Sequence, residues 1–135
     1  DGDDNIQPGA GDDKIYGGAG DDVIIQSGSG SQHYDGESGI DTLRLDVSSG
    51  WTTLNSSYPT SIEMDMVKGE IGQTNNPNNR DTFTGIENIT FIGNFTTFLT
   101  DNATANTIRG GDGIDNINAG SGKLTLHNSF KIHRV

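Results

Sequence analysis

A nine-residue spacing is the feature of this sequence that most restricts its fold. Residues 8–16 (PGAGDDKIY) and 17–25 (GGAGDDVII) place glycines, paired aspartates and an apolar run at the same positions. The segment 2–7 (GDDNIQ) fits the same frame, so the three isoleucines Ile6, Ile15 and Ile24 fall nine residues apart. A flexible linker rich in Gly and Asp has no reason to keep such a spacing. We therefore expect one structural unit for every nine residues.

Further units follow the first block and recur near the C-terminus. Gln26 adds one residue and shifts the frame, after which two more units occupy 27–35 and 36–44. A further unit at 110–118 (GGDGIDNIN) is flanked by weaker ones at 101–109 and 119–127. The repeats therefore form two blocks separated by a middle segment of different character.

These units resemble the calcium-binding nonapeptide of RTX (repeats-in-toxin) proteins of the hemolysin type, Gly-Gly-x-Gly-x-Asp-x-U-x with U apolar. The match is strong over 8–25 and 110–118, and good with substitutions in 2–7 and 36–44. The resemblance implies an all-β fold, a parallel β-roll or β-solenoid with Ca²⁺ in the Gly-Asp turns. Two nonamers would form one coil, with turns on alternating sides.

A chain built of such repeat units cannot fold on apolar burial alone. The first six residues of each unit must turn tightly and its last three form a short strand, whose eighth position points inward because strand side chains alternate. One inward apolar side chain for every nine residues cannot offset the entropy lost in ordering nine backbones. The expected inward column of the first block is Ile6, Ile15, Ile24, Tyr34 and Leu43.

Calcium ions would supply the missing stabilisation. Ca²⁺ accepts backbone carbonyls as well as carboxylates, and the resemblance places each ion between turns that are two repeats apart. Asp22 would then pair with both Asp4 and Asp41, whereas Asp13 would face Gln32 in a weaker site. The resemblance implies several Ca²⁺ ions with this set of ligands: Gly2, Asp4, Gly9, Gly11, Asp13, Gly18, Gly20, Asp22, Gly28, Gly30, Gly39, Asp41, Gly111, Gly113 and Asp115.

The C-terminal block is poorer in ligands. Asp115 would have Thr97 as its same-side neighbour, and the adjacent pair, Asn106 and Leu124, lacks carboxylates. We expect at most one weak site there, or a metal-free coil.

The charge of the chain excludes several partners. The formal net charge is -11 and the sequence pI is about 4.3, which disfavours nucleic acid and anionic membranes. No stretch approaches the roughly 18 apolar residues of a membrane span, so we expect no membrane insertion. Residues 1–46 carry -9 of the charge, which makes the acidity of the turns a set of cation ligands. His33, His127 and His133 show no metal spacing, and with no catalytic signature we expect a non-enzymatic module.

Four segments are predicted. Residues 1–46 form an RTX nonapeptide β-roll, 47–81 an irregular strand-rich insert, 82–127 a β-solenoid continuation with degenerate repeats, and 128–135 a tail outside the repeat pattern. In the continuation, Asn and Thr hydrogen bonds would hold the early turns, while an inward column resumes at Leu99, Ile108, Ile117 and Leu126. The aromatic residues of the middle would form a core or cap, with a carbohydrate platform as the alternative; they are Trp51, Phe83, Phe91, Phe95 and Phe98.

The primary functional hypothesis is a monomeric calcium-binding module of a larger secreted bacterial protein. The resemblance implies type I secretion and folding outside the cell, where calcium is plentiful, and the absence of Cys suits that route. One alternative is a polysaccharide-binding (alginate-like) module of a carbohydrate-active enzyme. It needs a basic strip, which requires folding to bring together Arg44, Lys68, Arg80 and Arg109. Another alternative is an adhesin segment that acts as a rigid spacer.

The pairing scheme predicts unequal effects for two similar substitutions. Asp22→Asn should weaken calcium-induced folding more than Asp13→Asn, because Asp22 serves two sites with paired carboxylates and Asp13 serves one site with a single carboxylate. The midpoints of calcium titrations followed by circular dichroism measure the difference. Equal midpoints for the two variants would contradict the pairing.

Overall fold

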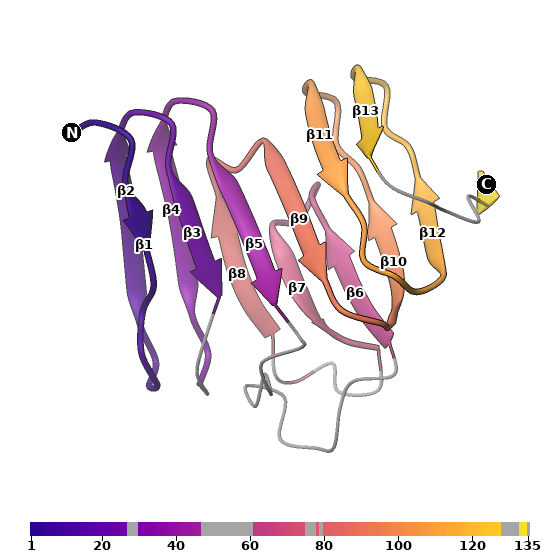
Figure 1. Cartoon of the computed structure of the whole chain (residues 1–135), viewed down its shortest axis with the longest axis horizontal. Coiled ribbons are helices and arrows are strands. Elements are labelled where there is room, and N and C mark those ends of the chain that lie inside the picture. Colours follow the sequence, from indigo (N-terminus) through magenta and orange to yellow (C-terminus); the bar gives the residue numbers. More distant parts are fainter. Residues whose placement is uncertain (27–29, 47–60, 75–77, 79, 128–132, 135) are drawn as a thin grey trace.

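The computed structural model describes residues 1–26, 30–46, 61–74, 78, 80–127 and 133–134, and these form an all-β structure. None of the described residues belongs to a helix long and apolar enough to cross a membrane. Figure 1 shows two layers of strands, with the chain advancing from the N-terminus at one end to the C-terminus at the other. The predicted parallel β-roll is confirmed, and the strands alternate between its two layers along the chain except at β6, β7 and β8, which all lie in one layer.

The first layer, sheet A, has six strands in the order β1-β3-β5-β9-β11-β13, and all their pairings are parallel. The strands are β1 (Asn5–Ile6), β3 (Val23–Gln26), β5 (Thr42–Asp46), β9 (Asn88–Ile92), β11 (Asn106–Arg109) and β13 (Leu124–His127).

The second layer, sheet B, has eight strands in the order β14-β12-β10-β6-β7-β8-β4-β2. Its pairings are parallel except those of β7, which is antiparallel to both of its neighbours. The strands are β2 (Lys14–Ala19), β4 (His33–Ser38), β6 (Ser61–Asp65), β7 (Glu70–Gln73), β8 (Arg80–Thr84), β10 (Thr96–Thr100), β12 (Asp115–Asn118) and β14 (His133–Arg134).

The register of the first coils follows the repeat and its one-residue shift. Ile6 pairs with Ile24, 18 positions on, whereas Ile24 pairs with Leu43, 19 positions on, because Gln26 lengthens the second coil. The expected inward residues Ile15, Ile24, Tyr34 and Leu43 are buried, and Ile6 in the end strand is half-buried. The column that was expected to resume also does so: Leu99, Ile108 and Ile117 are buried, and Leu126 is half-buried.

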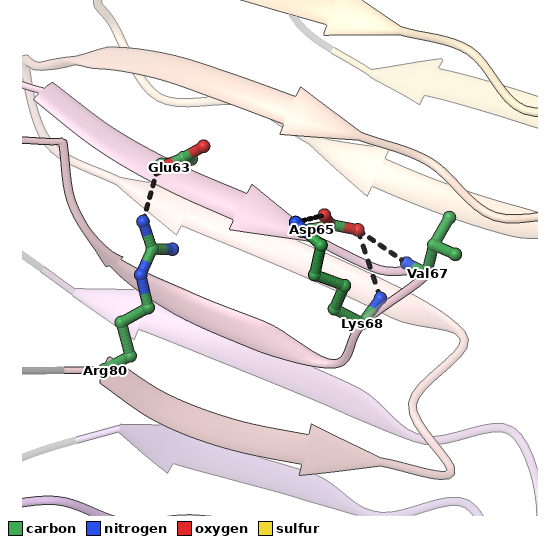
Figure 2. A network of polar contacts seen from close by, with 5 residues as sticks. All are labelled: Glu63, Asp65, Val67, Lys68 and Arg80. Carbon is green, nitrogen blue, oxygen red and sulfur yellow. Dashed lines mark hydrogen bonds and ion pairs between the residues drawn. The ribbon is translucent and has the colours of Figure 1, made fainter. Parts of the chain in front are cut away.

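The hairpin β6–β7 is the main departure from a regular roll. Its turn is fixed by Asp65, whose Oδ1 accepts hydrogen bonds from the amides of Val67 (3.0 Å) and Lys68 (3.1 Å), while its Oδ2 lies 2.9 Å from the Lys68 ammonium (Figure 2). Burial alone would raise the pKa of Asp65, but these contacts lower it below its ordinary value. The hairpin makes sheet B two strands wider than sheet A, so the layers diverge around it.

Large side chains fill the wider section of the core. Phe83, Phe91 and Phe95 are buried, and the rings of Phe91 and Phe95 meet edge to face with centroids 5.8 Å apart. The expectation of a core or cap holds for these three but is wrong for Phe98, which is 43% exposed because it points outward from β10. Trp51 lies outside the described residues.

The segment boundaries inferred from the sequence stay predictions. The tail at 128–135 lies largely outside the described residues, as does the first part of the insert, 47–60. β8 begins at Arg80, two residues before the expected start of the continuation, and pairs in parallel with β4 of the first block.

Candidate metal centres

The turns that lead from sheet B into sheet A form one edge of the roll, here called the first edge, and they stack their sixth-position acids in a column. Asp4 donates its amide to Asp22 Oδ1 at 2.8 Å, and Asp22 donates its amide to Asp41 Oδ1, also at 2.8 Å. The structure therefore brings together both carboxylate pairs that the repeat frame predicted. One carboxylate oxygen of Asp22 and one of Asp41 therefore accept a hydrogen bond from a backbone amide of the neighbouring turn.

The second oxygen of the Asp22 and Asp41 carboxylates is suited to bind a cation. Asp22 and Asp41 are both 0% exposed, and their Oδ2 atoms have no hydrogen-bond partner. Burial raises the pKa of Asp41, and the charges of Asp22 and Glu87 raise it further, although the bond from the Asp22 amide opposes the rise. A buried anionic oxygen without a partner is unfavourable, and a hard cation such as Ca²⁺ would satisfy both oxygens.

Glycines bring the carbonyl groups of successive turns against one another. A Cβ on Gly20 would lie 2.5 Å from the Gly2 carbonyl oxygen, and a Cβ on Gly39 would overlap the Gly20 oxygen. On the opposite edge, a Cβ on Gly30 would overlap the Gly11 oxygen in the same way. Gly2, Gly11, Gly20, Gly30 and Gly39 thus occupy the stacked turns, where carbonyl oxygens of one turn lie against the backbone of the next.

Three other predicted glycines are less informative. Gly9 has open space around it, and Gly18 lies near the end of β2, where a Cβ would be 3.8 Å from the Asp1 nitrogen. Gly28 lies outside the described residues. The assignment of individual carbonyl ligands therefore stays a prediction.

The second edge, made of turns that lead from sheet A into sheet B, is built differently. Gln32 sits beside Asp13, as predicted, because β2 and β4 pair Lys14 with His33. Gln32 donates its Nε2 to the Gly11 carbonyl at 2.9 Å, whereas Asp13 Oδ2 is buried without a partner. An amide thus occupies one of the carbonyl oxygens that a cation would use, and the weaker affinity expected for this site stays a prediction.

A buried carboxylate that the repeat frame did not identify lies next in that column. Asp81 is 5% exposed and accepts hydrogen bonds from the Gln32 amide (3.0 Å) and the Gln26 side-chain amide (2.5 Å). Burial raises the pKa of Asp81 to about 6, even though both hydrogen bonds lower it. Asp81 lies near the start of the alternating strand β8, but only the pairing of β8 with β4 shows that it occupies a sixth position.

The first edge also contains an acid that sequence reasoning missed. Glu87 accepts the Asp41 amide through Oε2 at 2.9 Å, which extends the column by one coil. Its turn lacks the Gly-Gly-x-Gly pattern, so only the pairing of β9 with β5 reveals the position.

The fifth-position aspartates have a structural role. Asp3 accepts a hydrogen bond from the Asp21 amide, Asp12 from the Ser31 amide, and Asp21 from the Ile40 amide, all at 2.9 Å. These three carboxylates are exposed. They tie neighbouring turns together through backbone amides.

The C-terminal block offers two buried carboxylates, Asp101 and Asp115. Asp101 is 3% exposed, its Oδ2 lacks a partner, and burial raises its pKa. Asp115 is 1% exposed, both of its oxygens lack a partner, and burial raises its pKa. Its neighbour in the register is Thr97, and Asn106 pairs with Leu124, as predicted. Gly111 and Gly113 pack against the Gly93 and Phe95 carbonyls, so the turn is formed but holds a single buried acid, since Asp112 is exposed.

Side-chain hydrogen bonds hold the turn between β10 and β11. Asn102 Oδ1 accepts from both the amide and the hydroxyl of Thr104, at 2.9 and 2.6 Å. Asn106 donates its Nδ2 to the Glu87 carbonyl at 2.8 Å. This is the Asn and Thr support that the sequence predicted for the continuation.

Any cation in these turns has to depend on backbone oxygens as much as on carboxylates. Within the described ranges, no three acidic or histidine side chains converge as a set of metal ligands. The turns instead combine paired carboxylates with stacked carbonyls, which is a donor set of hard oxygens suited to Ca²⁺.

Comparison with known families supports this interpretation. Four copies of the RTX calcium-binding nonapeptide repeat match residues 1–25 and 93–123. Over these two stretches the chain carries RTX repeats. Repeats of this family form a non-catalytic, calcium-binding structural module. The match includes Asp4, Asp13, Asp22 and Asp115 but not Asp41. No curated protein and no solved structure matches the chain.

The raised pKa of Asp81 predicts that Asp81→Asn increases the stability of the folded chain by an amount that depends on pH. The folded chain buries an ionised Asp81 above about pH 6, so wild-type stability falls as pH rises from the ordinary pKa of 3.8 through about 6. In excess Ca²⁺ the variant should be about 3 kcal/mol more stable than wild type at pH 7, and roughly half that at pH 5. Urea unfolding of the two proteins at each pH measures the gap. A variant less stable than wild type at pH 7 would instead identify Asp81 as a cation ligand.

Proposed function

We propose that this chain is a calcium-binding structural module whose first block, residues 1–46, folds when Ca²⁺ binds. The observation that carries the proposal is the column on the first edge, where Asp22 and Asp41 are fully buried and each keeps one carboxylate oxygen without a partner. The family match supports calcium as the ion.

The same column explains why folding would depend on the ion. Without a cation, folding has to bury two like charges side by side, which the low dielectric of the interior makes unfavourable. The compensating apolar burial is small, because each short strand contributes little more than one inward side chain. Binding free energy then becomes folding free energy.

Calcium should therefore change the amount of β-structure. In excess chelator we expect the chain to lose much of the β-signal in far-ultraviolet circular dichroism, and millimolar Ca²⁺ should restore it, because modest affinities of roughly 10⁻⁴–10⁻³ M are enough in extracellular modules. Mg²⁺ at the same concentration serves as the control, since it prefers a smaller octahedral site. An equally β-structured chain in chelator and in Ca²⁺ would refute the proposal.

We further propose that the module works outside the cell as part of a larger secreted bacterial protein. Proteins with these repeats are typically secreted, and the absence of Cys lets the chain dispense with disulfide formation. In this setting the module stays unfolded at the low calcium of the cytosol and folds where calcium is abundant.

A second candidate function, binding of an acidic polysaccharide, is favoured by one groove. Arg44 and Arg109 both pair with Thr90 on the outward face of sheet A, so they lie two strands apart, about 10 Å. They line a groove of about 490 Å³ together with Thr42 and Thr90. Guanidinium groups bind carboxylates with charge-assisted hydrogen bonds, so the groove suits a uronic-acid chain better than a neutral one.

Only two of the four candidate basic residues contribute to this groove. Lys68 contacts Asp65 in the hairpin turn, and Arg80 contacts Glu63 in sheet B (Figure 2). The basic strip is therefore limited to Arg44 and Arg109, of which Arg44 also contacts Asp46 at 3.9 Å.

Calorimetry with oligomeric alginate in saturating Ca²⁺ tests this second function. Arg109→Ala should weaken binding about tenfold, which corresponds to the loss of one charge-assisted hydrogen bond. Lys68→Ala removes one positive charge outside the groove and should leave the affinity unchanged. Equal binding of a neutral oligosaccharide, or an unchanged affinity in Arg109→Ala, would argue against it.

A further inference from the structure

We propose that Asp41 and Glu87 complete a further Ca²⁺ site, located between the turn at 36–41 and the short turn at 85–87 that no repeat matches. This inference rests on the proposed calcium-binding function and adds a site to it. The second turn comes from the middle of the chain, so an ion here would join the first block to the β9 strand.

The backbone places Glu87 where a repeat would place its aspartate. Val23 donates its amide to the Asp4 carbonyl and Thr42 donates its amide to the Asp22 carbonyl, both at 2.8 Å. Asn88 donates its amide to the Asp41 carbonyl in the same way, at 2.9 Å. The residue before Asn88 therefore occupies the sixth position of the next coil.

The carboxylate of Glu87 also repeats the contact made by the aspartates. Its Oε2 accepts the Asp41 amide at 2.9 Å, just as Asp41 Oδ1 accepts the Asp22 amide at 2.8 Å. The longer glutamate side chain spans the distance from a turn that has fewer residues than the repeat. The two acidic groups are consequently neighbours along the roll.

An unpartnered oxygen points to a ligand between these turns. Asp41 is 0% exposed and its Oδ2 has no hydrogen-bond partner. A Cβ added to Gly36 would lie 2.5 Å from this Oδ2 and would overlap the Gly85 carbonyl oxygen. A carboxylate oxygen of one turn and a carbonyl oxygen of the next therefore converge over Gly36.

The same convergence occurs one coil earlier, in a pair of turns that both belong to nonapeptide units. A Cβ on Gly17 would overlap Asp22 Oδ2 and would lie 2.8 Å from the Gly36 carbonyl oxygen. Gly17, Gly36 and Gly85 are thus equivalent in the stack, although Gly85 lies outside every repeat. Gly85 has φ +61°, a conformation that favours glycine and that aims its carbonyl at this space.

The neighbouring turn is also held in a strained conformation. Glu37 has φ +65°, the one positive φ of a non-glycine residue in the described part of the chain. It stands at the second position of its unit, where the repeat has glycine, and a Cβ on Gly85 would lie 2.9 Å from its amide nitrogen. Such strain persists where the surroundings fix the backbone and concentrates at ligand sites.

Counting ions tests the proposal directly. Bound Ca²⁺ per chain is measured by equilibrium dialysis at about 1 mM free Ca²⁺, the range of extracellular modules. Glu87→Gln keeps an oxygen for the Asp41 amide but removes the charge, so it should bind one ion fewer, or bind that ion at least about tenfold more weakly. Asp41→Asn, which touches two sites, should lose more than Glu87→Gln. Glu87→Asp keeps the charge and should retain more of the binding.

A matched control distinguishes the loss of this site from a general loss of negative charge. Glu70→Gln removes one acidic charge at the start of β7, outside the column, and should leave the ion count unchanged. If Glu87→Gln needs more Ca²⁺ to fold, the count is taken where its circular dichroism equals that of wild type. A count equal to wild type there would overturn this inference alone. A wild-type chain that binds no Ca²⁺ would overturn the proposed function as well.

Discussion

The structure of the first edge depends on how two carboxylate oxygens are shared. In each coil, one oxygen of a sixth-position acid accepts the amide of the previous turn, which sets the register of the turns. The other oxygen of Asp22 and Asp41 is left in the interior without a partner. The hydrogen bonds thus position the acids, but they also assemble like charges that only a cation can neutralise. The stacking of the acids therefore both orders this edge and gives it affinity for the ion.

The second edge shows the effect of replacing the cation with amides. Gln32 donates to the Gly11 carbonyl and Gln26 donates to Asp81, so two neutral side chains occupy positions that an ion would otherwise serve. A hydrogen-bonded amide needs no ion and responds little to calcium. The amides leave the charge of Asp81 buried, and the raised pKa of Asp81, about 6, makes this edge sensitive to pH. The first edge of the roll therefore depends on the calcium concentration, whereas the second edge depends on pH.

Local periodicity predicted the repeating part of the fold, whereas features that depend on pairing between distant strands were missed. The nine-residue frame, with its shift at Gln26, was enough to predict the inward column and the neighbours of Asp22 in the stack. Glu87 and Asp81 were missed because their turns lack the glycine pattern, and their positions are defined by strands β5 and β4 far away in the sequence. The antiparallel strand β7 was also missed, because alternation of apolar and polar residues predicts a strand but not its direction.

The hairpin β6–β7 determines where the acidic column stops. It adds two strands to sheet B between β8 and β10, whereas β9 and β11 remain neighbours in sheet A. A cleft of about 340 Å³ opens on the first edge between the hairpin turn and the turns near Glu87 and Asn102. Beyond it, Asn106 contacts the Glu87 carbonyl through an amide, and Asn102 and Thr104 hold the next turn by hydrogen bonds. The hairpin thus separates the column of paired acids from the C-terminal coils, whose turns combine uncharged side chains with the isolated buried carboxylates Asp101 and Asp115. Paired carboxylates, and with them the strongest dependence on a cation, are therefore concentrated in the coils before the hairpin.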